Sequence, residues 1–262
     1  MNILETIVAN KKIEVESKKL EKSISDLEMS DLFQRKTLSL HEFLLDKNRT
    51  GIIAEYKRKS PSKGIINNIS TVEDVTKAYA EYASGISVLT DEKFFGGNTN
   101  DLLKARFNQI PILRKDFMID EYQIIEAKSI GADVILLIAA CLTVQEVKQF
   151  ASLAKRLGLE VLLEIHNDEE LGHICDDIDF VGVNNRNLKT FIVDIDTSLH
   201  LINKIPTGKL AIAESGISNV DTIVTLHNAG FKGFLIGENF MKEPNPSVAF
   251  ASFVTQLKTK LE

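Results

Sequence analysis

The chain has 262 residues but no tryptophan, only two cysteines and only five prolines. Two cysteines cannot form a disulfide framework, and Cys141 and Cys175 lack metal-ligand spacing, so we interpret both as small apolar residues. The five histidines also show no spacing typical of a metal site. The sequence therefore predicts neither a disulfide-stabilised fold nor a metal site.

Long apolar runs and an excess of positive charge are absent as well. The N-terminus, MNILETIVANKKIEVESKKL, is interrupted by charged residues and lacks the apolar run of a signal peptide or membrane span, which predicts a cytoplasmic protein. A formal net charge of −6 argues against a broad surface for nucleic acid or anionic membrane. No P-loop, GxGxxG fingerprint or Ser-His-Asp order occurs, which disfavours NTP hydrolysis, dinucleotide chemistry and acyl transfer.

The sequence contains a regular alternation of short apolar runs and amphipathic stretches. Residues 2 to 48 carry apolar positions at helical spacing, and from Gly51 onward β-branched runs alternate with helical segments such as 72 to 83, 120 to 130 and 144 to 158. Gly131 and Gly158 follow two of these segments as expected helix caps. Eight strands are predicted, at residues 52 to 57, 86 to 90, 110 to 115, 133 to 139, 160 to 165, 179 to 184, 210 to 215 and 233 to 237.

Eight strands with intervening helices in a chain of this length predict an α/β protein with a (β/α)₈ TIM barrel. A doubly wound open sheet would usually need fewer strands. No linker rich in proline, glycine or serine divides the chain, so we expect one domain over residues 1–262. Residues 1–48 would form a helical N-terminal extension that packs over one end of the barrel.

Polar residues close several of the predicted strands. Because side chains alternate faces along a strand, Glu55 and Lys57 point together, and Leu162 shares a face with Glu164. If these faces point inward, the polar ends meet at the C-terminal mouth, where barrel enzymes place their sites. A group of internal ion pairs that merely fills the mouth is the alternative, although buried ion pairs are poor stabilisers. The strand-closing residues are Lys57, Lys115, Glu164, Asn184 and Glu214.

Two short segments suit a phosphate group. ESGIS (214 to 218) and GENF (237 to 240) follow neighbouring strands, and their glycines allow backbone N–H groups to approach an anion. Either glycine alone could simply form a tight turn. The basic loop KRKSPSKG (57 to 64) follows the first strand, where it could close over an anionic ligand as a lid or remain a solvated loop.

The motifs IIAEYKRKSPSKG (52 to 64), ISVLTDEKFFGG (86 to 97), PILRKDFMIDEYQIIEAKSIGAD (111 to 133), GVNNRNL (182 to 188), AESGIS (213 to 218) and LIGENFM (235 to 241) occur in this order. The chain thereby closely resembles the indole-3-glycerol-phosphate synthase family. The resemblance implies ring closure of 1-(2-carboxyphenylamino)-1-deoxyribulose 5-phosphate, with loss of CO₂ and water, in tryptophan biosynthesis. It implies no cofactor and a small substrate with a carboxylate at one end and a phosphate at the other.

The resemblance also implies roles for individual residues. Lys115 resembles the general acid of ring closure, Lys57 the lysine that holds the substrate carboxylate, and Glu164 the base or acid of dehydration. Glu55 and Asn184 would orient the lysines and substrate, and Glu214 would lie near the reacting amine. The substrate-binding residues implied are Ser60, Arg186, Ser215, Gly216, Gly237 and the main chain of Glu238 at the phosphate, and Phe95, Phe117, Leu136 and Leu188 at the aromatic ring.

Other functions remain open from the residues alone. In a Schiff-base aldolase-type barrel Lys115 would become covalently attached to its substrate, and a sugar-phosphate isomerase barrel would share the phosphate loops. A barrel that only binds a phosphorylated metabolite would show no turnover. We expect a monomer with a small anionic substrate, and no nucleic-acid or membrane partner.

Overall fold

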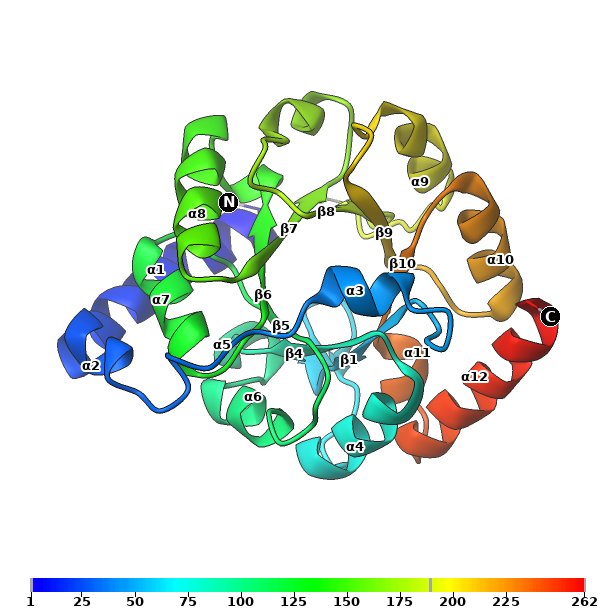
Figure 1. Ribbon diagram of the computed structural model, residues 1–262, viewed down its shortest axis with the longest axis horizontal. Coiled ribbons are helices and arrows are strands. Elements are labelled where there is room, and N and C mark those ends of the chain that lie inside the picture. The colour runs from blue at the N-terminus through cyan, green and yellow to red at the C-terminus, as the bar shows by residue number, and fades with distance from the viewer. Residues whose placement is uncertain (1, 189, 262) are drawn as a thin grey trace.

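The structure of the chain is a computed structural model that describes residues 2–188 and 190–261. The outermost residues of the predicted domain, 1 and 262, lie outside this description. A closed barrel of parallel strands stands at the centre (Figure 1), with strand order β1-β10-β9-β8-β7-β6-β5-β4. The strands are β1 Ile52–Tyr56, β4 Gly85–Leu89, β5 Ile112–Lys115, β6 Val134–Ile138, β7 Glu160–Ile165, β8 Phe180–Asn184, β9 Leu210–Glu214 and β10 Gly233–Ile236. The predicted (β/α)₈ fold and all eight strands are confirmed, each to within two residues.

Helices surround the barrel as an outer ring (Figure 1). The predicted segments are helices, and Gly131 and Gly158 adopt the positive φ values, 87° and 74°, that favour glycine after a helix. The expectation of a helix after every strand was wrong at one place, because the polar segment between β7 and β8 forms only a short 3₁₀ helix, η2. The elements around the barrel are α4 Val72–Tyr82, α5 Glu92–Phe95, α6 Thr99–Ala105, α7 Glu121–Ser129, η1 Ala139–Cys141, α8 Val144–Arg156, η2 Glu169–His173, α9 Asp196–Leu201, η3 Ile202–Lys204, α10 Val220–Ala229, α11 Glu238–Met241 and α12 Pro246–Leu261.

Alternate residues of the strands fill the barrel interior, as the period of two requires. Ile53, Leu113, Leu162, Phe180 and Ile212 are fully buried in one cluster inside the barrel, whereas their sequence neighbours pack outward against the helices. Glu55, Lys115, Glu164 and Glu214 stand two residues beyond members of this cluster and therefore extend from the same inner face towards the mouth.

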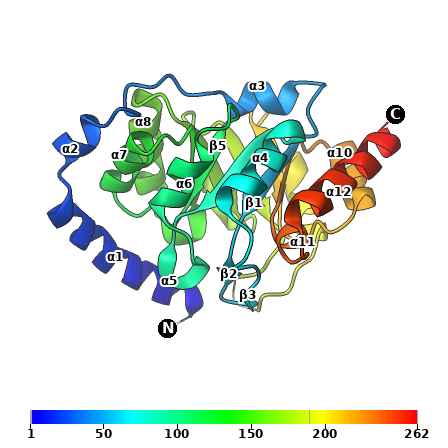
Figure 2. The same ribbon diagram turned by 90° about the horizontal axis from the view of Figure 1, so that it is seen from below.

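The N-terminal extension contains α1 Ile3–Glu21, α2 Ile24–Glu28 and α3 Leu40–Leu45. Figure 2 shows that α1 lies beside α5 and the hairpin of β2 Lys59–Ser60 and β3 Gly64–Ile65 at one end of the barrel, whereas α3 lies at the other end. Leu40 and Leu44 of α3 pack on the bottom of the interior cluster. The expectation that the extension covers one end was therefore wrong. Its apolar positions are distributed along the whole segment, so the segment runs between the two ends of the barrel.

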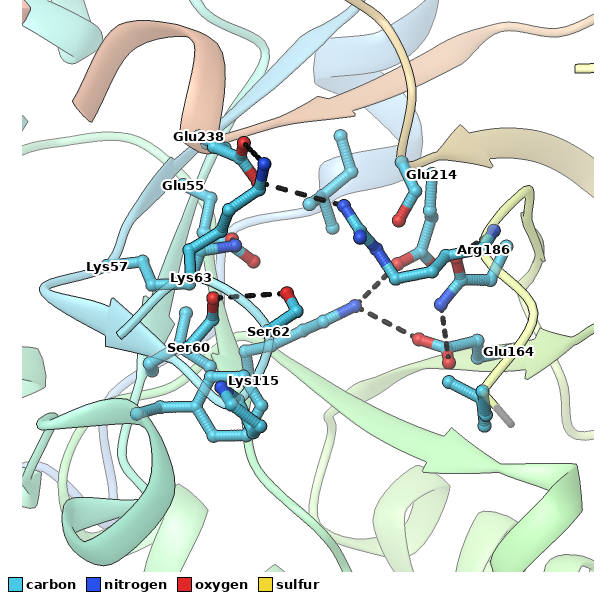
Figure 3. A pocket seen from close by; sticks show the side chains of 18 of the residues that line it. Glu55, Lys57, Ser60, Ser62, Lys63, Lys115, Glu164, Arg186, Glu214 and Glu238 are labelled. Carbon is cyan, nitrogen blue, oxygen red and sulfur yellow. Dashed lines mark hydrogen bonds and ion pairs between the residues drawn. The ribbon is translucent and has the colours of Figure 1, made fainter. Parts of the chain in front are cut away.

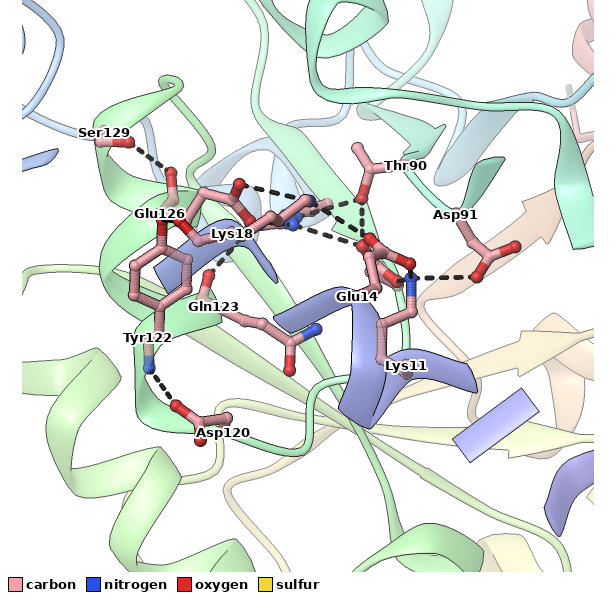
Figure 4. A network of polar contacts seen from close by, with 12 residues as sticks. Lys11, Glu14, Lys18, Thr90, Asp91, Asp120, Tyr122, Gln123, Glu126 and Ser129 are labelled. Carbon is pink, nitrogen blue, oxygen red and sulfur yellow. Dashed lines mark hydrogen bonds and ion pairs between the residues drawn. The ribbon is translucent and has the colours of Figure 1, made fainter. Parts of the chain in front are cut away.

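A buried charge cluster attaches α1 to the barrel (Figure 4). The side chain of Lys11 is fully buried, and its Nζ lies 2.9 Å from both Asp91 and Asp116 and 2.8 Å from Glu14. Burial opposes the charge of Lys11, but the surrounding carboxylates outweigh it and raise the pKa of the ammonium. Asp116 directly follows Lys115 in the chain. The cluster therefore fixes α1 next to the strand end that carries a predicted catalytic residue.

Candidate active site

The C-terminal ends of the strands surround a cavity of about 630 Å³. Every residue that the sequence predicted for the site lines this one cavity, although the segments that carry them are spread along the chain. The roles of these residues remain predictions. The sixteen are Glu55, Lys57, Ser60, Phe95, Phe117, Leu136, Lys115, Glu164, Asn184, Arg186, Leu188, Glu214, Ser215, Gly216, Gly237 and Glu238.

Lys115 lies between two carboxylates at the floor of the cavity (Figure 3). Its Nζ donates to Oε2 of Glu164 at 3.1 Å and makes a shorter contact with Oε2 of Glu214. The other oxygen of Glu164 accepts a hydrogen bond of 3.0 Å from Nδ2 of Asn184. Three strands therefore hold one ammonium and two carboxylates within hydrogen-bonding reach.

Burial and mutual attraction set the protonation states of these groups. Burial opposes the charge of Lys115, but Glu214 and Glu164 outweigh it and raise the pKa of the ammonium. Burial also raises the pKa of the Glu214 carboxyl, and repulsion from Glu164 adds to this effect. The pKa of Glu164 is lowered despite its burial, because Lys115 and His166 both favour its ionised form. The site therefore separates the two carboxyls into an anion and a group that accepts a proton more readily.

Glu214 is incompletely satisfied although it lies closest to Lys115. Within residues 2–188 and 190–261, no donor reaches its buried Oε1. A buried carboxylate oxygen without a partner is costly in a folded protein. This oxygen lies against Gly182 of the neighbouring strand, where an added Cβ would overlap it, so it is enclosed by β8.

Glu55 and Lys57 form a second ion pair on β1, with Nζ of Lys57 donating to Oε1 of Glu55 at 2.6 Å. Glycines on the neighbouring strands make room for the carboxylates. A Cβ at Gly237 would lie 2.6 Å from Oε1 of Glu55, and a Cβ at Gly182 would overlap Oε1 of Glu214. Gly237, predicted only as a phosphate-loop glycine, therefore also admits the side chain of Glu55.

The rim above β9 and β10 contains the segments predicted for phosphate. Ser215 and Gly216 have φ values of 66° and 78°, a left-handed pair that is unusual for serine. Gly237 precedes α11, so the main-chain N–H of Glu238 lies in the first turn of that helix. The carboxylate of Glu238 lies between Lys63 and Arg186, 3.7 Å from each (Figure 3). A negative side chain therefore contacts the two cations nearest this rim.

The basic loop after β1 forms a small hairpin, β2 Lys59–Ser60 with β3 Gly64–Ile65. Only part of its charge faces the cavity. Arg58 pairs with Asp101, and Nζ of Lys59 donates to the carbonyl of Lys93 at 2.6 Å, so both are directed away from the cavity. Lys63 lines the cavity. The positive character of the loop towards a ligand is therefore smaller than its sequence indicates.

The opposite wall is apolar. The rings of Phe95 and Phe117 lie 6.0 Å apart between centroids, and Leu136 and Leu188 line the same cavity. This wall can hold an aromatic ring by stacking and burial. The sequence did not predict that α1 contributes to the cavity, which this helix lines with the apolar residues Ile3, Leu4 and Ile7. Their helical spacing was noted, but it does not show which surface the helix covers.

His166 is a second residue that the sequence analysis did not assign to the site. Its Nε2 lies 3.2 Å from Oε1 of Glu164, and its Nδ1 lies 3.1 Å from Oε2 of Glu170. The spacing Glu-x-His at a strand end was the available signal, because residues two apart share a face. No group of three or more His, Cys, Asp or Glu in the described part of the chain is arranged to hold a metal ion.

None of the helices formed by residues 2–188 and 190–261 is long and apolar enough to cross a membrane.

A closed (β/α)₈ barrel whose strand ends carry acids, bases, an amide-rich rim and an aromatic wall has the arrangement of a barrel enzyme for a small anionic molecule. The family model of indole-3-glycerol phosphate synthase matches residues 4–253. The chain therefore belongs to the indole-3-glycerol phosphate synthase family.

Individual relatives agree with this membership. The chain is 46% identical over 259 residues to an indole-3-glycerol phosphate synthase of Bacteroides thetaiotaomicron, covering 98% of this chain and 99% of that protein. It is 42% identical to one of Lachnospira eligens, with 96% of each chain covered. Among solved structures, the tryptophan synthase A-subunit of Pyrococcus furiosus superposes with a TM-score of 0.60 at 18% identity, covering 80% of this chain and 99% of that one. That likeness supports the barrel fold alone.

Proposed function

We propose that this chain is an indole-3-glycerol-phosphate synthase, which closes the pyrrole ring of 1-(2-carboxyphenylamino)-1-deoxyribulose 5-phosphate with loss of CO₂ and water. The placement of Lys115 between Glu164 and Glu214 carries the proposal, because it puts an acid and two carboxylates at one point of the cavity. The aromatic wall and the amide-rich rim lie on either side and suit the two ends of this substrate.

Lys115 is proposed as the general acid. When the substituted ring carbon attacks the ketone carbon, negative charge develops on the ketone oxygen, and an ammonium beside it supplies the proton. The raised pKa of Lys115 keeps its side chain protonated before the reaction. Loss of CO₂ then restores the aromatic ring. Once it has regained a proton from solvent, which balances the proton consumed by loss of CO₂ from a carboxylate, the same lysine is suited to protonate the hydroxyl that leaves as water.

Glu164 is proposed as the base of the dehydration step, since its lowered pKa keeps the carboxylate ionised. Asn184 fixes the orientation of Glu164 by donating to its Oε1. Glu214, which lines the cavity and contacts Lys115 through Oε2, is proposed to lie near the reacting amine. Lys57, paired with Glu55, would hold the substrate carboxylate until it departs as CO₂.

The phosphate is proposed to bind at the rim formed by Ser60, Arg186, Ser215, Gly216 and the main chain after Gly237. Backbone N–H groups at a left-handed turn and at a helix start are suitable anion donors. Phe95, Phe117, Leu136 and Leu188 would bind the aromatic ring. A monomeric, cytoplasmic enzyme is part of the same proposal, and sedimentation of the purified chain would test its oligomeric state.

The Schiff-base alternative is disfavoured by the electrostatics of Lys115. A nucleophilic lysine must be a neutral amine, whereas two carboxylates hold this side chain as an ammonium. The test is an indole-fluorescence assay with the carboxyphenylamino-deoxyribulose phosphate. We expect growth of indole emission with release of one CO₂ per product. Binding without turnover, or an adduct on Lys115 trapped by borohydride, would contradict the proposed reaction.

A further inference from the structure

His166 is located behind Glu164, on the side away from Lys115. Glu164 presents Oε2 to Lys115 at 3.1 Å and Oε1 to Nε2 of His166 at 3.2 Å, so its two oxygens contact two different cationic groups. The hydrogen of Nε2 is not aligned with Oε1 in a regular hydrogen bond. The contact is therefore chiefly an attraction between charges.

The other ring nitrogen of His166 is held by Glu170. Oε2 of Glu170 lies 3.1 Å from Nδ1 and also accepts a 2.8 Å hydrogen bond from the main-chain N–H of His166. These contacts fix the ring in position. An imidazole between two carboxylates favours the doubly protonated form, since each ring nitrogen then presents positive charge to a carboxylate. Burial opposes this, but the two carboxylates prevail and raise the pKa of His166 to about 10.

We propose that His166 is a positioning residue that, as an imidazolium held by Glu170, keeps Glu164 ionised and correctly oriented when Lys115 turns from Glu164 to the substrate. This inference rests on the proposed function. During the reaction Lys115 gives up its proton, and without another cation nearby Glu164 would lose the charge that stabilises its ionised form. His166 lies outside the floor of the cavity, so it remains available throughout.

The other charged groups near this pair do not replace His166. Cys141 faces both carboxylates, but its pKa is raised to about 12 by burial and by Glu164 and Glu170, so the thiol stays neutral. A second cavity of about 620 Å³ adjoins His166 and Glu170 and gives water access to them. The groups that act on Glu164 or His166 are Lys115 from β5, Glu214 from β9, Glu170 from η2 and Cys141 from η1. Glu55 from β1 acts on Lys115 and Glu214, and Arg186 and Asp194 line the second cavity.

The first test compares pH profiles of kcat, which report the groups of the enzyme–substrate complex, for the full chain and for His166→Gln. Glutamine can donate a hydrogen bond but carries no charge. Removing an opposite charge at this distance raises a carboxyl pKa by about 1 to 3 units. The acidic limb of the profile is therefore expected to move to higher pH by at least about one unit. Glu170→Gln is expected to shift the limb in the same direction.

His200→Gln is the matched control. His200 also pairs with a carboxylate, Oδ2 of Asp168 at 2.9 Å, but its side chain is 58% exposed and lies on the outer helix layer. The control should keep the wild-type profile. An unchanged acidic limb in an active His166→Gln variant would overturn the inference. If wild-type protein forms no indole product, the proposed function itself fails.

A second measurement needs neither turnover nor a variant. The ¹⁵N NMR signals of the His166 ring in the wild-type chain distinguish imidazolium from neutral imidazole. We expect the imidazolium pattern to persist at pH 8, above the range in which an ordinary histidine loses its proton. A neutral ring at pH 7 would overturn the inference, whatever the kinetic result. A purely structural role of His166 would not depend on the charge of its ring.

Discussion

Gly237 on one strand end leaves the space that the carboxylate of Glu55 on the neighbouring strand occupies. A Cβ at position 237 would lie 2.6 Å from Oε1 and 2.8 Å from Cβ of Glu55. The backbone itself does not require glycine there, because φ is −128°. Close packing between two strands of the barrel is therefore the reason for a glycine.

Gly237→Ala should displace Glu55 and separate it from Lys57. Overpacking of this kind costs about 1–3 kcal/mol, and misplacement of the ion pair should lower kcat/KM at least about tenfold. Gly172→Ala is the control, because no described atom lies within 4 Å of the added Cβ. Kinetics and thermal unfolding of both variants would be compared. Wild-type kcat/KM in Gly237→Ala would show that Glu55 need not occupy its observed position.

Lys115→Ala and Glu164→Gln should each lower kcat by about 10² or more while the fold remains intact, which is the scale of lost acid–base catalysis. Lys155→Ala, which removes a lysine paired with Asp179 on the outer surface, is the matched control and should leave kcat unchanged. Single-turnover assays and circular dichroism would measure the effect. A variant of Lys115 or Glu164 with nearly full activity would remove that residue from the mechanism.

Glu238→Gln should strengthen substrate binding. The carboxylate of Glu238 lies 3.7 Å from Lys63 and Arg186 and competes with an incoming phosphate for both cations. Partly exposed ion pairs contribute about 0.2–1 kcal/mol, so KM should fall up to about fivefold. The difference in KM between Glu238→Gln and the wild type should become smaller as salt is added, because salt screens these charges. A rise in KM would mean that the carboxylate assists binding.

Lys11→Met should destabilise the protein strongly, because it removes the buried cation shared by Glu14, Asp91 and Asp116. Among the residues that the structure describes, Asp116 then keeps only Arg114 and Glu14 only Lys18 as a cationic partner. Loss of one partner from a buried ion pair costs about 3–5 kcal/mol. Lys19 lies on the same helix as Lys11 but is partly exposed, and it pairs with Glu16 and Asp120. Lys19→Met should therefore lower the free energy of unfolding by less than about 1 kcal/mol. Urea unfolding measures the free energy of unfolding of both variants. Equal losses in Lys11→Met and Lys19→Met would show that the buried cluster contributes no more to stability than a surface ion pair.

Asp116 should make stability depend on pH in the acidic range. Burial raises its pKa, but Lys11 and Arg114 outweigh burial and lower it to about 2 from 3.8. A lowered pKa in the folded state contributes stability above the unfolded value, and this is lost as the pH falls through the folded value. About 1 kcal/mol should be lost between pH 5 and pH 3. The unfolding free energy of wild type minus that of Asp116→Asn should therefore narrow over this range, and a constant difference would contradict it.

Much of the fold was predictable because its signals are local. Each strand is a short apolar run, and Gly131 and Gly158 mark helix ends through the backbone conformation that glycine favours. The polar strand ends were likewise visible from the alternation of side chains. Leu40 and Ile7 gave no comparable signal, because an apolar helical face indicates burial but does not identify the surface against which it packs.

The sequence by itself determined the order of strands and helices, and it determined which residues share a face of each strand, since both depend on spacings of a few residues. Only the tertiary structure decided that Arg58 and Lys59 are directed away from the cavity, that α1 contributes to the cavity wall, and that His166 supports Glu164 from behind. The protonation states of the buried groups were also decided only by the tertiary structure. Charges separated by tens of residues come together only when the barrel closes, and the balance between their mutual attraction and the cost of burial then sets which of them remain ionised.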